Sequence, residues 1–439
     1  MPRITTLHAR EILDSRGNPT IEVNVTLDDG ARGRGIAPSG ASTGKAEVLE
    51  LRDCDPKRYH GRGVRKALEN VEQAIAPAVR GMEASNQEAL DRCLCELDDT
   101  ENKSRLGANA ILGVSLAVAR AAAASAGMPL YRYLGGQQAV KLPVPMVNIA
   151  SGGLHGGGNI DFQDFQVIPL RAQTFSQAVH DVVLIYRAMK DVLKARGVSS
   201  PGVADEGGYA PALASNEAGF EVMMEAFERA GFKPAIDAAI AVDVAASHFY
   251  QGGCYRLSTE REEWSSLDLV DRLATWCERY PIISIEDGVA EDDEAGWKLL
   301  TQRLGQRCQL IGDDLFVTNP RRLAEGIRDG IANAVLVKMN QVGTVSETLE
   351  AIRLAKRAGY GTVVSARSGE TEDDSMSDLA VGTSAGQLKV GAITRSERLA
   401  KYNRLLRIEE QLGARAVYRG AETFRRYSSE FAARGRSSP

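Results

Sequence analysis

Val335-Leu336-Val337-Lys338-Met339-Asn340-Gln341 is an apolar run that ends abruptly in a lysine. A short, continuous apolar run of this kind predicts a buried β-strand, which would deliver Lys338 to its carboxyl end. Burying an ammonium group without a partner costs several kcal/mol, so an opposite charge is expected close to Lys338. Other parts of the chain have to supply that charge.

Five further apolar runs share this form, and each ends in a charged residue. They are residues 239–243, 282–287, 309–314, 361–367 and 386–389. The first three end in carboxylates, and the last two end in Arg367 and Lys389. Successive terminal charges are 22 to 43 residues apart, which leaves room for a crossover helix and a return strand. The pattern predicts an α/β barrel whose active site gathers at the carboxyl ends of its strands.

The composition is ordinary for a globular protein and argues against several functional classes. The 439 residues are 44% hydrophobic and 25% charged, which is enough for two domains with sizeable cores. The net charge is −5, and no basic stripe interleaved with aromatic residues indicates a nucleic-acid partner. The first residues lack the apolar core of a secretory signal, so a cytoplasmic location is expected. The six cysteines match no zinc or haem spacing and are expected to be reduced thiols.

The first third of the chain predicts an α+β domain over residues 1–136. Residues 21–27 alternate between apolar and polar, as in a half-buried strand, and the segments on either side complete a three-stranded meander. Helical periodicity then takes over, ending in the alanine-rich stretch 108–126. This stretch contains Arg120 and is rich in alanine rather than leucine, so it predicts a buried helix and not a membrane span.

A glycine and glutamine linker is expected at residues 134–138, followed by the barrel domain over residues 140–432. The polar tail, residues 434–439, is expected to be frayed.

Three glycine-containing loops can approach a ligand. Residues 38–44, with Ser42, offer backbone N–H groups and hydroxyls to a phosphate or a metal. Residues 151–158 place five glycines around His155, as in a mobile flap that brings an imidazole over a ligand. Asp205 and Glu206 precede a glycine pair. Taken alone, each loop also fits an ordinary surface turn, so its interpretation depends on the others.

Asp243, Glu286 and Asp313 would converge at three neighbouring strand ends of the barrel. Three carboxylates at close range need a cation to stay ionised, and a hard divalent ion with oxygen ligands, Mg²⁺ first, is the simplest choice. Thiolates and clustered histidines are missing from this set, which argues against zinc.

Lys338 and Lys389 would face this metal from the other side of the barrel. A nearby cation lowers the pKa of a lysine, so one of the two can be neutral enough to act as a base. Arg367 supplies a bidentate fork for a phosphate or a carboxylate. Together these groups suit removal of a proton next to a carboxylate, with the metal and Lys389 stabilising the resulting enolate.

At this point a resemblance becomes specific. Ordered motifs occur at residues 11–20, 39–44, 107–112, 205–211, 284–288, 312–315 and 368–373. In these motifs the chain resembles the enolase family over nearly its whole length, and a lysine base with Mg²⁺ is a standing example of that superfamily's chemistry. The resemblance implies a modified TIM barrel preceded by an α+β capping domain. It also implies a cytoplasmic homodimer or higher homo-oligomer that dehydrates 2-phosphoglycerate to phosphoenolpyruvate, with two Mg²⁺ per active site.

The resemblance also implies roles for individual residues. Lys338 matches the base that removes the C2 proton, and Glu206 matches the residue that assists departure of the C3 hydroxyl. Asp243, Glu286 and Asp313 match ligands of the first metal, and Ser42 matches a loop ligand of the second. The positions that match substrate contacts are His155, Gln163, Arg367, Ser368 and Lys389.

Two positions depart from the family pattern. The family has a histidine where this chain has Ala366, and a glutamate where it has Asp164, and both positions lie beside the substrate in the family. Replacing imidazole by methyl removes about five ring atoms and leaves a space that is wet or filled by something larger. The shorter acid at position 164, a catalytic candidate, retracts its carboxylate by about 1.5 Å. A displacement of that size can cost on the order of a hundredfold in rate.

The departures leave several interpretations open. One is a weakened or inactive enolase. We favour retained chemistry on an altered substrate, because Lys338, Glu206, Lys389, Arg367 and the three metal carboxylates are kept. The room beside Arg367 suits a 2-phosphoglycerate analogue with a bulkier anionic head, such as a carboxyphosphonate ester. Its product would be carboxyphosphonoenolpyruvate, as for an enolase-like enzyme of phosphonate antibiotic biosynthesis.

The main alternative is an ordinary glycolytic enolase that tolerates the substitutions. A surface receptor on the same scaffold loses support, since the chain ends Arg436-Ser437-Ser438-Pro439 without the C-terminal lysines of such receptors. An acid-sugar or racemase branch would need a pair of bases on earlier strands, which the sequence lacks. The expected partner is therefore a small phosphorylated or phosphonylated hydroxy acid, with no nucleic acid and no membrane.

Overall fold

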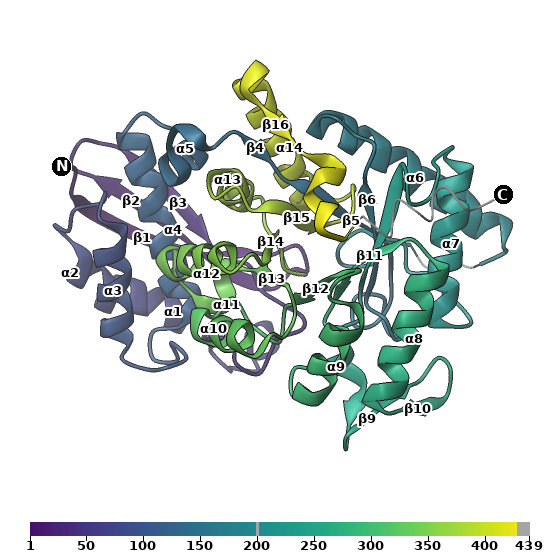
Figure 1. Cartoon of the computed structure of the whole chain (residues 1–439). Helices are drawn as coiled ribbons and strands as arrows, with labels where there is room; N and C mark the ends of the chain where they lie inside the picture. The colour runs from purple at the N-terminus through teal and green to yellow at the C-terminus, as the bar shows by residue number, and fades with distance from the viewer. Residues whose placement is uncertain (199–201, 428–439) are drawn as a thin grey trace.

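The computed structural model describes residues 1–198 and 202–427. The predicted frayed tail and the last residues of the expected barrel domain lie outside this described part. Within it, a sheet with its helices forms one side of the molecule and a closed barrel forms the other (Figure 1). The predicted α/β class, a barrel preceded by an α+β unit, is confirmed.

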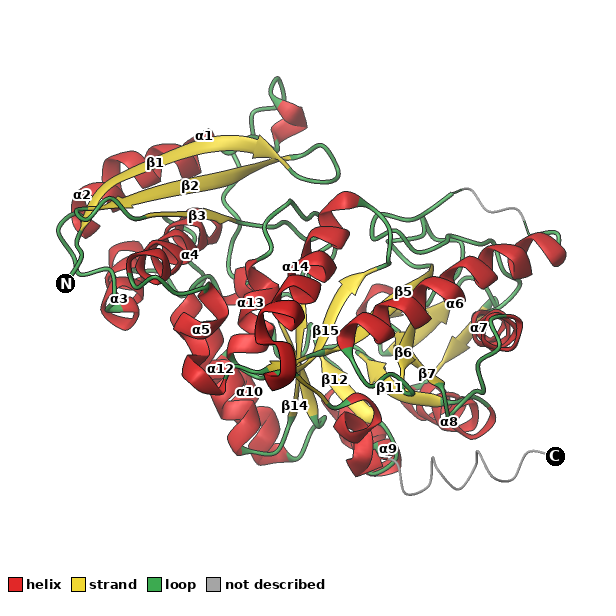
Figure 2. Ribbon diagram, turned by 90° about the horizontal axis from the view of Figure 1, so that it is seen from above, coloured by secondary structure: helices red, strands yellow, loops and turns green. Residues whose placement is uncertain are grey.

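The N-terminal unit is a three-stranded antiparallel sheet covered by helices (Figure 2). Its strands, in spatial order, are β1 (Ile4–Leu13), β2 (Pro19–Leu27) and β3 (Arg32–Ile36), as the meander predicted. The helices are α1 (Arg65–Asn70), α2 (Ala76–Val79), α3 (Gln87–Asp98) and α4 (Ala108–Ser125). A π-helical turn (Val71–Ile75) joins α1 to α2, so the helix over residues 65–79 is continuous but locally underwound.

Helix α4 packs directly on β3 and forms the centre of this unit. Gly33 and Gly35 permit the close approach, because a Cβ atom at either position would overlap the α4 backbone at Ala117 or Gly113. In the described part of the chain, α4 is the one helix with the length and apolarity to cross a membrane, yet 83% of that window is buried inside the protein. It is a core helix of the capping unit, as its alanine content predicted.

The expected linker at residues 134–138 is not an irregular segment. Helix α5 (Leu130–Gly135) and a 3₁₀ turn (Gly136–Gln138) occupy this segment. A Cβ atom at Gly135 would overlap the backbone oxygen of Gly382, at the end of α13 (Ser375–Gly382). The glycine therefore allows two helices to touch, and its presence did not signal a flexible connection.

The barrel closes through eight strands, in the order β11-β12-β13-β14-β15-β5-β6-β7. The strands are β5 (Val144–Ser151), β6 (Asp164–Pro169), β7 (Ala238–Asp243), β11 (Ile282–Glu286), β12 (Gln309–Gly312), β13 (Ala334–Val337), β14 (Gly361–Ser365) and β15 (Gly386–Gly391). The helices around it are α6 (Phe175–Ala195), α7 (Asn216–Arg229), α8 (Ser266–Arg279), α9 (Glu294–Leu304), α10 (Pro320–Asp329), α11 (Met339–Val342), α12 (Val345–Arg357), α13 and α14 (Ser396–Leu412). Each run predicted from the sequence forms a barrel strand.

One barrel strand runs against the others. β6 pairs antiparallel with both β5 and β7, whereas the remaining pairs are parallel. As a result the first residue of β6, Asp164, lies opposite Ser151 and Asp243, the last residues of its two neighbours. The start of β6 therefore reaches the same rim as the carboxyl ends of the parallel strands.

Candidate active site

The rim of the barrel gathers the predicted site residues around one pocket of about 290 Å³. Eleven of the thirteen proposed residues line it: Ser42, His155, Gln163, Glu206, Asp243, Asp313, Lys338, Ala366, Arg367, Ser368 and Lys389. The other two lie directly behind this wall, since Glu286 contacts Lys389 and Asp164 contacts His155. Gly40 and Ala41, from the 38–44 loop, also line the pocket, so the capping unit contributes to it.

The charges at the centre of the pocket are paired with one another. Lys389 Nζ lies 2.8 Å from Asp243 Oδ2 and 2.7 Å from each carboxylate oxygen of Glu286. Lys338 Nζ contacts Asp313 Oδ2. All five side chains are buried. Asp313 therefore supplies the counter-charge that Lys338, at the end of an apolar strand, requires.

The predicted lowering of a lysine pKa refers to the metal-bound site and stays a prediction, whereas the ion pairs of the protein alone act in the opposite direction. Burial lowers the pKa of Lys389, but Asp243 and Glu286 more than offset it and hold that pKa well above the ordinary value. Burial likewise lowers the pKa of Lys338, and Asp313 outweighs it, so the net shift is upward. The prediction assumed a cation among the carboxylates, whereas here the lysines themselves occupy the space between them.

The carboxylates nevertheless suit a hard cation. Burial and the neighbouring Asp243 charge raise the pKa of Glu286 well above its ordinary value, which is the strain that a bound cation relieves. The side-chain oxygen Oε1 of Gln163 is buried beside Asp243 without a hydrogen-bond partner. The donor set of carboxylates, an amide oxygen and Ser42 is composed of oxygen atoms alone, which fits Mg²⁺ and not zinc.

The positions of the acidic groups differ in detail from the expected trio. Among the described residues, two groups each bring three possible ligand atoms within 4.8 Å of one another. The groups are His155–Asp164–Glu206 and Asp287–Asp313–Asp314. Asp243, Glu286 and Asp313 stand further apart, with the lysine ammonium groups between them. Asp287 accepts hydrogen bonds from the backbone N–H groups of Asp313 (2.9 Å) and Asp314 (2.8 Å), so it orients the turn that carries Asp313.

The anion-binding side of the pocket contains a glutamate that the sequence analysis missed. Arg367 donates from Nη1 to Glu47 Oε2 (2.9 Å) and from Nη2 to the backbone oxygen of Ser42 (2.8 Å). Gln341 donates to both Asp313 (2.8 Å) and Glu47 (3.2 Å). It therefore links Asp313 to the carboxylate that pairs with Arg367. Gln341 stands three residues after Lys338, and that spacing on one helical turn was the available signal. Nothing in the local sequence distinguishes Glu47 from other acidic residues.

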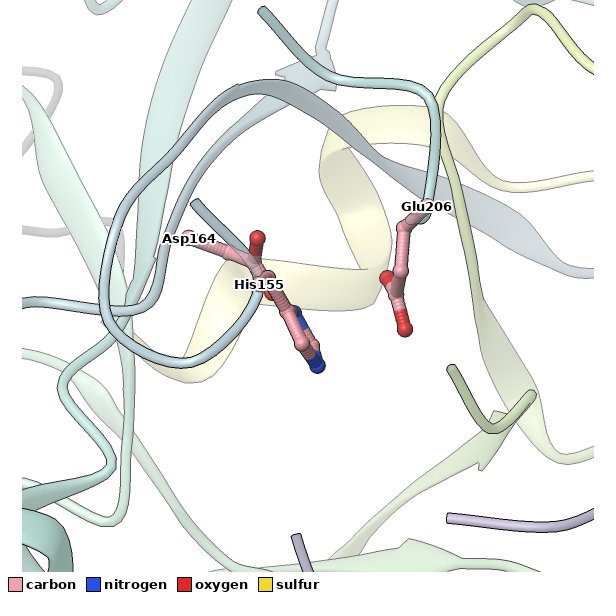
Figure 3. Close-up of side chains that lie close together, drawn as sticks. All are labelled: His155, Asp164 and Glu206. Atoms are coloured by element: carbon pink, nitrogen blue, oxygen red, sulfur yellow. The ribbon is translucent and has the colours of Figure 1, made fainter. Parts of the chain in front are cut away.

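The flap holds His155 against a buried carboxylate. His155 Nδ1 lies 3.0 Å from Asp164 Oδ2, and Asp164 Oδ1 accepts a hydrogen bond from Ser151 (3.0 Å). Glu206 approaches the same imidazole from the loop before α7 (Figure 3). Burial lowers the pKa of His155, but Asp164 and Glu206 outweigh it and raise the pKa to about 9. Asp164 therefore faces His155 and not the open pocket.

Glu206 lies close to two positively charged side chains, His155 and Arg398. Burial raises its pKa, but the positive charges of His155 and Arg398 hold that pKa below the ordinary value. Arg398 Nη1 lies 4.0 Å from Glu206 Oε1 and is fully buried. Glu206 is thus an ionised carboxylate on the pocket wall.

Ala366 lies on the pocket wall between Ser365 and Arg367 and is 5% exposed. Its backbone N–H donates to the carbonyl of Lys389 (2.8 Å), which fixes the wall of β14 against β15. Only a methyl group projects here, so the position adds no hydrogen-bonding group to the pocket.

Two family comparisons cover almost the whole chain. Residues 4–134 match the family described as "Enolase, N-terminal domain". Residues 139–427 match the family described as "Enolase, C-terminal TIM barrel domain". The two matches follow the order of the capping unit and the barrel, and the second alone covers more than half of the chain. The chain therefore belongs to the enolase family, as its motifs had led us to expect.

Proposed function

We propose that this protein is a Mg²⁺-dependent dehydratase that eliminates water from a 2-phosphoglycerate analogue with an enlarged anionic head group. The product would be carboxyphosphonoenolpyruvate, an intermediate of phosphonate antibiotic biosynthesis. The family supports a hydro-lyase, and the residues that we propose to remove the proton and the hydroxyl group, Lys338 and Glu206, both line the pocket. The observation that carries the choice of substrate is Ala366, whose methyl group stands beside Arg367 where the family has an imidazole.

In this proposal each charged residue has a defined task. Lys338, freed from Asp313, would first lose its proton to solvent and then accept the C2 proton as a neutral amine, and Lys389 faces the negative charge that develops on the substrate carboxylate. Asp243, Glu286 and Asp313 would hold Mg²⁺, with a second ion at Ser42, and the metal would supply positive charge for the same carboxylate. Glu206 takes up the proton of His155 and passes it to the C3 hydroxyl, which leaves as water.

Asp164 has an indirect task in this scheme. Its carboxylate is completely buried and held by Ser151 and His155, so it keeps the imidazole protonated and fixed in orientation. A longer glutamate at this position would extend further toward the pocket. The shorter side chain and the missing imidazole at Ala366 together leave more room around the substrate.

An ordinary enolase that converts 2-phosphoglycerate to phosphoenolpyruvate is the second candidate. The observation in its favour is the 38–44 loop, whose Ser42 backbone oxygen accepts a hydrogen bond from Arg367 (2.8 Å) and so places the loop at the pocket wall beside that arginine.

Steady-state kinetics with Mg²⁺ and both substrates separate the two candidates. We expect kcat/KM for the carboxyphosphonate analogue to exceed that for 2-phosphoglycerate by at least about tenfold, equivalent to about 1.4 kcal/mol in the transition state. An Ala366→His variant should lose activity on the analogue first, because the imidazole refills the space. Equal or better kcat/KM for 2-phosphoglycerate in the wild-type protein would overturn the altered-substrate proposal.

We also infer a cytoplasmic homodimer or higher homo-oligomer from the family. Sedimentation velocity at micromolar concentration tests the oligomeric state directly, and a single monomeric species would contradict it.

A further inference from the structure

A turn in the capping unit reaches across to the substrate-binding loop of the barrel. Asp14 accepts hydrogen bonds from the backbone N–H groups of Arg16 and Asn18, both 2.8 Å, and these bonds fix the turn after β1. The Arg16 side chain leaves this turn and is only 15% exposed. It ends against Ser368, which follows Arg367 on the pocket wall.

Ser368 receives two hydrogen bonds at its hydroxyl oxygen. Arg16 Nη1 donates to Ser368 Oγ at 3.2 Å, and the backbone N–H of Ala41 donates to the same oxygen at 2.7 Å. A guanidinium and a peptide N–H can only donate, so neither can accept the proton of the hydroxyl group. A serine oxygen has two lone pairs, and these contacts use both of them.

The proton of the Ser368 hydroxyl is therefore available for another acceptor. Within residues 1–198 and 202–427, the hydrogen bonds of Ser368 Oγ are the two that it accepts. The side chain lines the pocket next to Arg367 and is 4% exposed, so its remaining proton is available to a ligand bound there. A phosphate, phosphonate or carboxylate is such an acceptor, because each has at least one unprotonated oxygen at neutral pH.

We propose that Arg16 is a positioning residue that makes the Ser368 hydroxyl an obligatory donor to the anionic head group of the substrate. This inference rests on the proposed function only in taking an anionic head as the ligand. It holds for 2-phosphoglycerate as well as for the larger analogue. Arg16 acts through Ser368 and reaches the substrate only by way of that hydroxyl group.

The geometry explains why an arginine is needed at this position. A second nitrogen, Nη2, donates to the backbone oxygen of Ser39 at 3.0 Å, so one planar fork holds the 38–44 loop and Ser368 in a fixed relation. The Nε atom is buried without a hydrogen-bond partner, and the nearest carboxylate, Asp14, is 3.6 Å from Nη2.

A double-mutant cycle between Arg16 and Ser368 tests the proposal. The variants are Arg16→Met, Ser368→Ala and the double variant, each assayed with Mg²⁺ on whichever of the two substrates the wild-type protein uses better. We expect each single variant to raise KM about tenfold with kcat changed less than threefold, since the anion contact is present in ground and transition states alike. The double variant should raise KM no more than either single variant.

Controls separate positioning from a merely structural role. Arg10→Met removes a cation that is 52% exposed on β1 of the same unit, and it should leave kcat and KM as in the wild type. Arg16→Lys can keep only one of the two contacts and should recover part of the lost KM. Arg16→Gln, which keeps an N–H donor, replaces the methionine variant in the cycle if that variant does not fold.

The effects of Arg16→Met and Ser368→Ala on KM would multiply in the double variant if the two residues acted independently. That outcome overturns the positioning role, and so does a fall in kcat at unchanged KM. A preference for 2-phosphoglycerate would contradict the proposed substrate and leave this cycle valid, so the two proposals fail separately.

Discussion

The His155 imidazole shows how single residues of this pocket control one another's charge. Asp164 and Glu206 each bring an atom within 4.8 Å of it, and they raise its pKa to about 9 although burial opposes the shift. The unfolded-state value is about 6.5. The protonated imidazole therefore contributes stability that is fully present below pH 6.5 and is lost as the pH rises through 9, on the order of 3 kcal/mol in all.

Removing the charge of Asp164 should reverse this shift. In an Asp164→Asn variant Glu206 alone of the two carboxylates still opposes burial, so we expect the pKa of His155 to fall from about 9 toward the ordinary value. Histidine NMR titration of the metal-free protein measures it, with a His155→Gln variant to identify the resonance. In parallel, the free energy of unfolding of the wild type should decline between pH 6.5 and 9, while that of the variant stays flat. A wild-type resonance that titrates near 6.5 would contradict the charged pair.

At this scale the sequence predicted the residues that carry charge at strand ends, because their place after an apolar run marks them. It missed the residues that bind and orient these charged side chains. Glu47, Gln341 and Arg16 reach the pocket through contacts between segments 294 to 352 positions apart, as in the Gln341–Glu47 and Arg16–Ser368 pairs. No local pattern distinguishes such residues from other polar surface residues, since their partners are chosen by the fold.

Among the elements, β6 and α14 show what periodicity can and fails to reveal. The direction of β6 follows from the short flap before it, since a parallel return requires a crossover of a dozen or more residues, normally with a helix. Helix α14 has buried cations on its inner face. Arg398 and Lys401 are completely buried, and both donate to backbone oxygens of the 367–371 loop. A pattern that equates buried with apolar assigns such positions to the surface.

Arg398 should therefore stabilise the loop that carries the anion contacts. It donates to the carbonyls of Arg367 (2.5 Å), Ser368 (2.5 Å) and Val390 (3.1 Å). An Arg398→Met variant removes a buried donor from all three oxygens, and we expect a loss of about 3–5 kcal/mol in the free energy of unfolding. Urea denaturation measures it. Arg407→Met, at an exposed position of the same helix, should change stability by no more than about 0.5 kcal/mol. Equal effects of the two variants would contradict the loop-holding role.

In the molecule as a whole, the pocket is completed from both sides. The 38–44 loop of the capping unit contacts Arg367 and Ser368, and Arg120 of α4 bonds Asp373 and Asp374 of the barrel at 3.1 and 2.7 Å. The sequence indicated both units in their order. It did not indicate how closely the capping unit packs against the barrel, because that packing depends on ion pairs between the two units.

The lysines and carboxylates inside the pocket neutralise one another, and this affects metal binding. Lys389 now spans Asp243 and Glu286, so Mg²⁺ has to compete with an ammonium group for the same oxygens. When a cation binds one of these carboxylates, the carboxylate raises the pKa of the neighbouring lysine less. In the proposed mechanism, metal binding and the formation of a neutral lysine base would therefore be coupled, although the proposed base and the proposed metal ligands stand on different strands.

Mg²⁺ should accordingly stabilise the folded protein in a way that depends on these carboxylates. At a free concentration of one hundred times the Kd, a single site adds about 2.7 kcal/mol to the free energy of unfolding. We expect a rise in Tm with Mg²⁺ that EDTA reverses, measured by calorimetry at constant ionic strength and pH. Glu286→Gln should abolish most of this rise by removing one ligand charge. Asp292→Asn is the matched control, since it removes an acid that is 57% exposed and pairs with Lys45 outside the metal set. If Glu286→Gln showed the full rise in Tm with Mg²⁺, the metal would bind elsewhere. Lys389 would then be the one cation that stabilises the ionised form of Glu286.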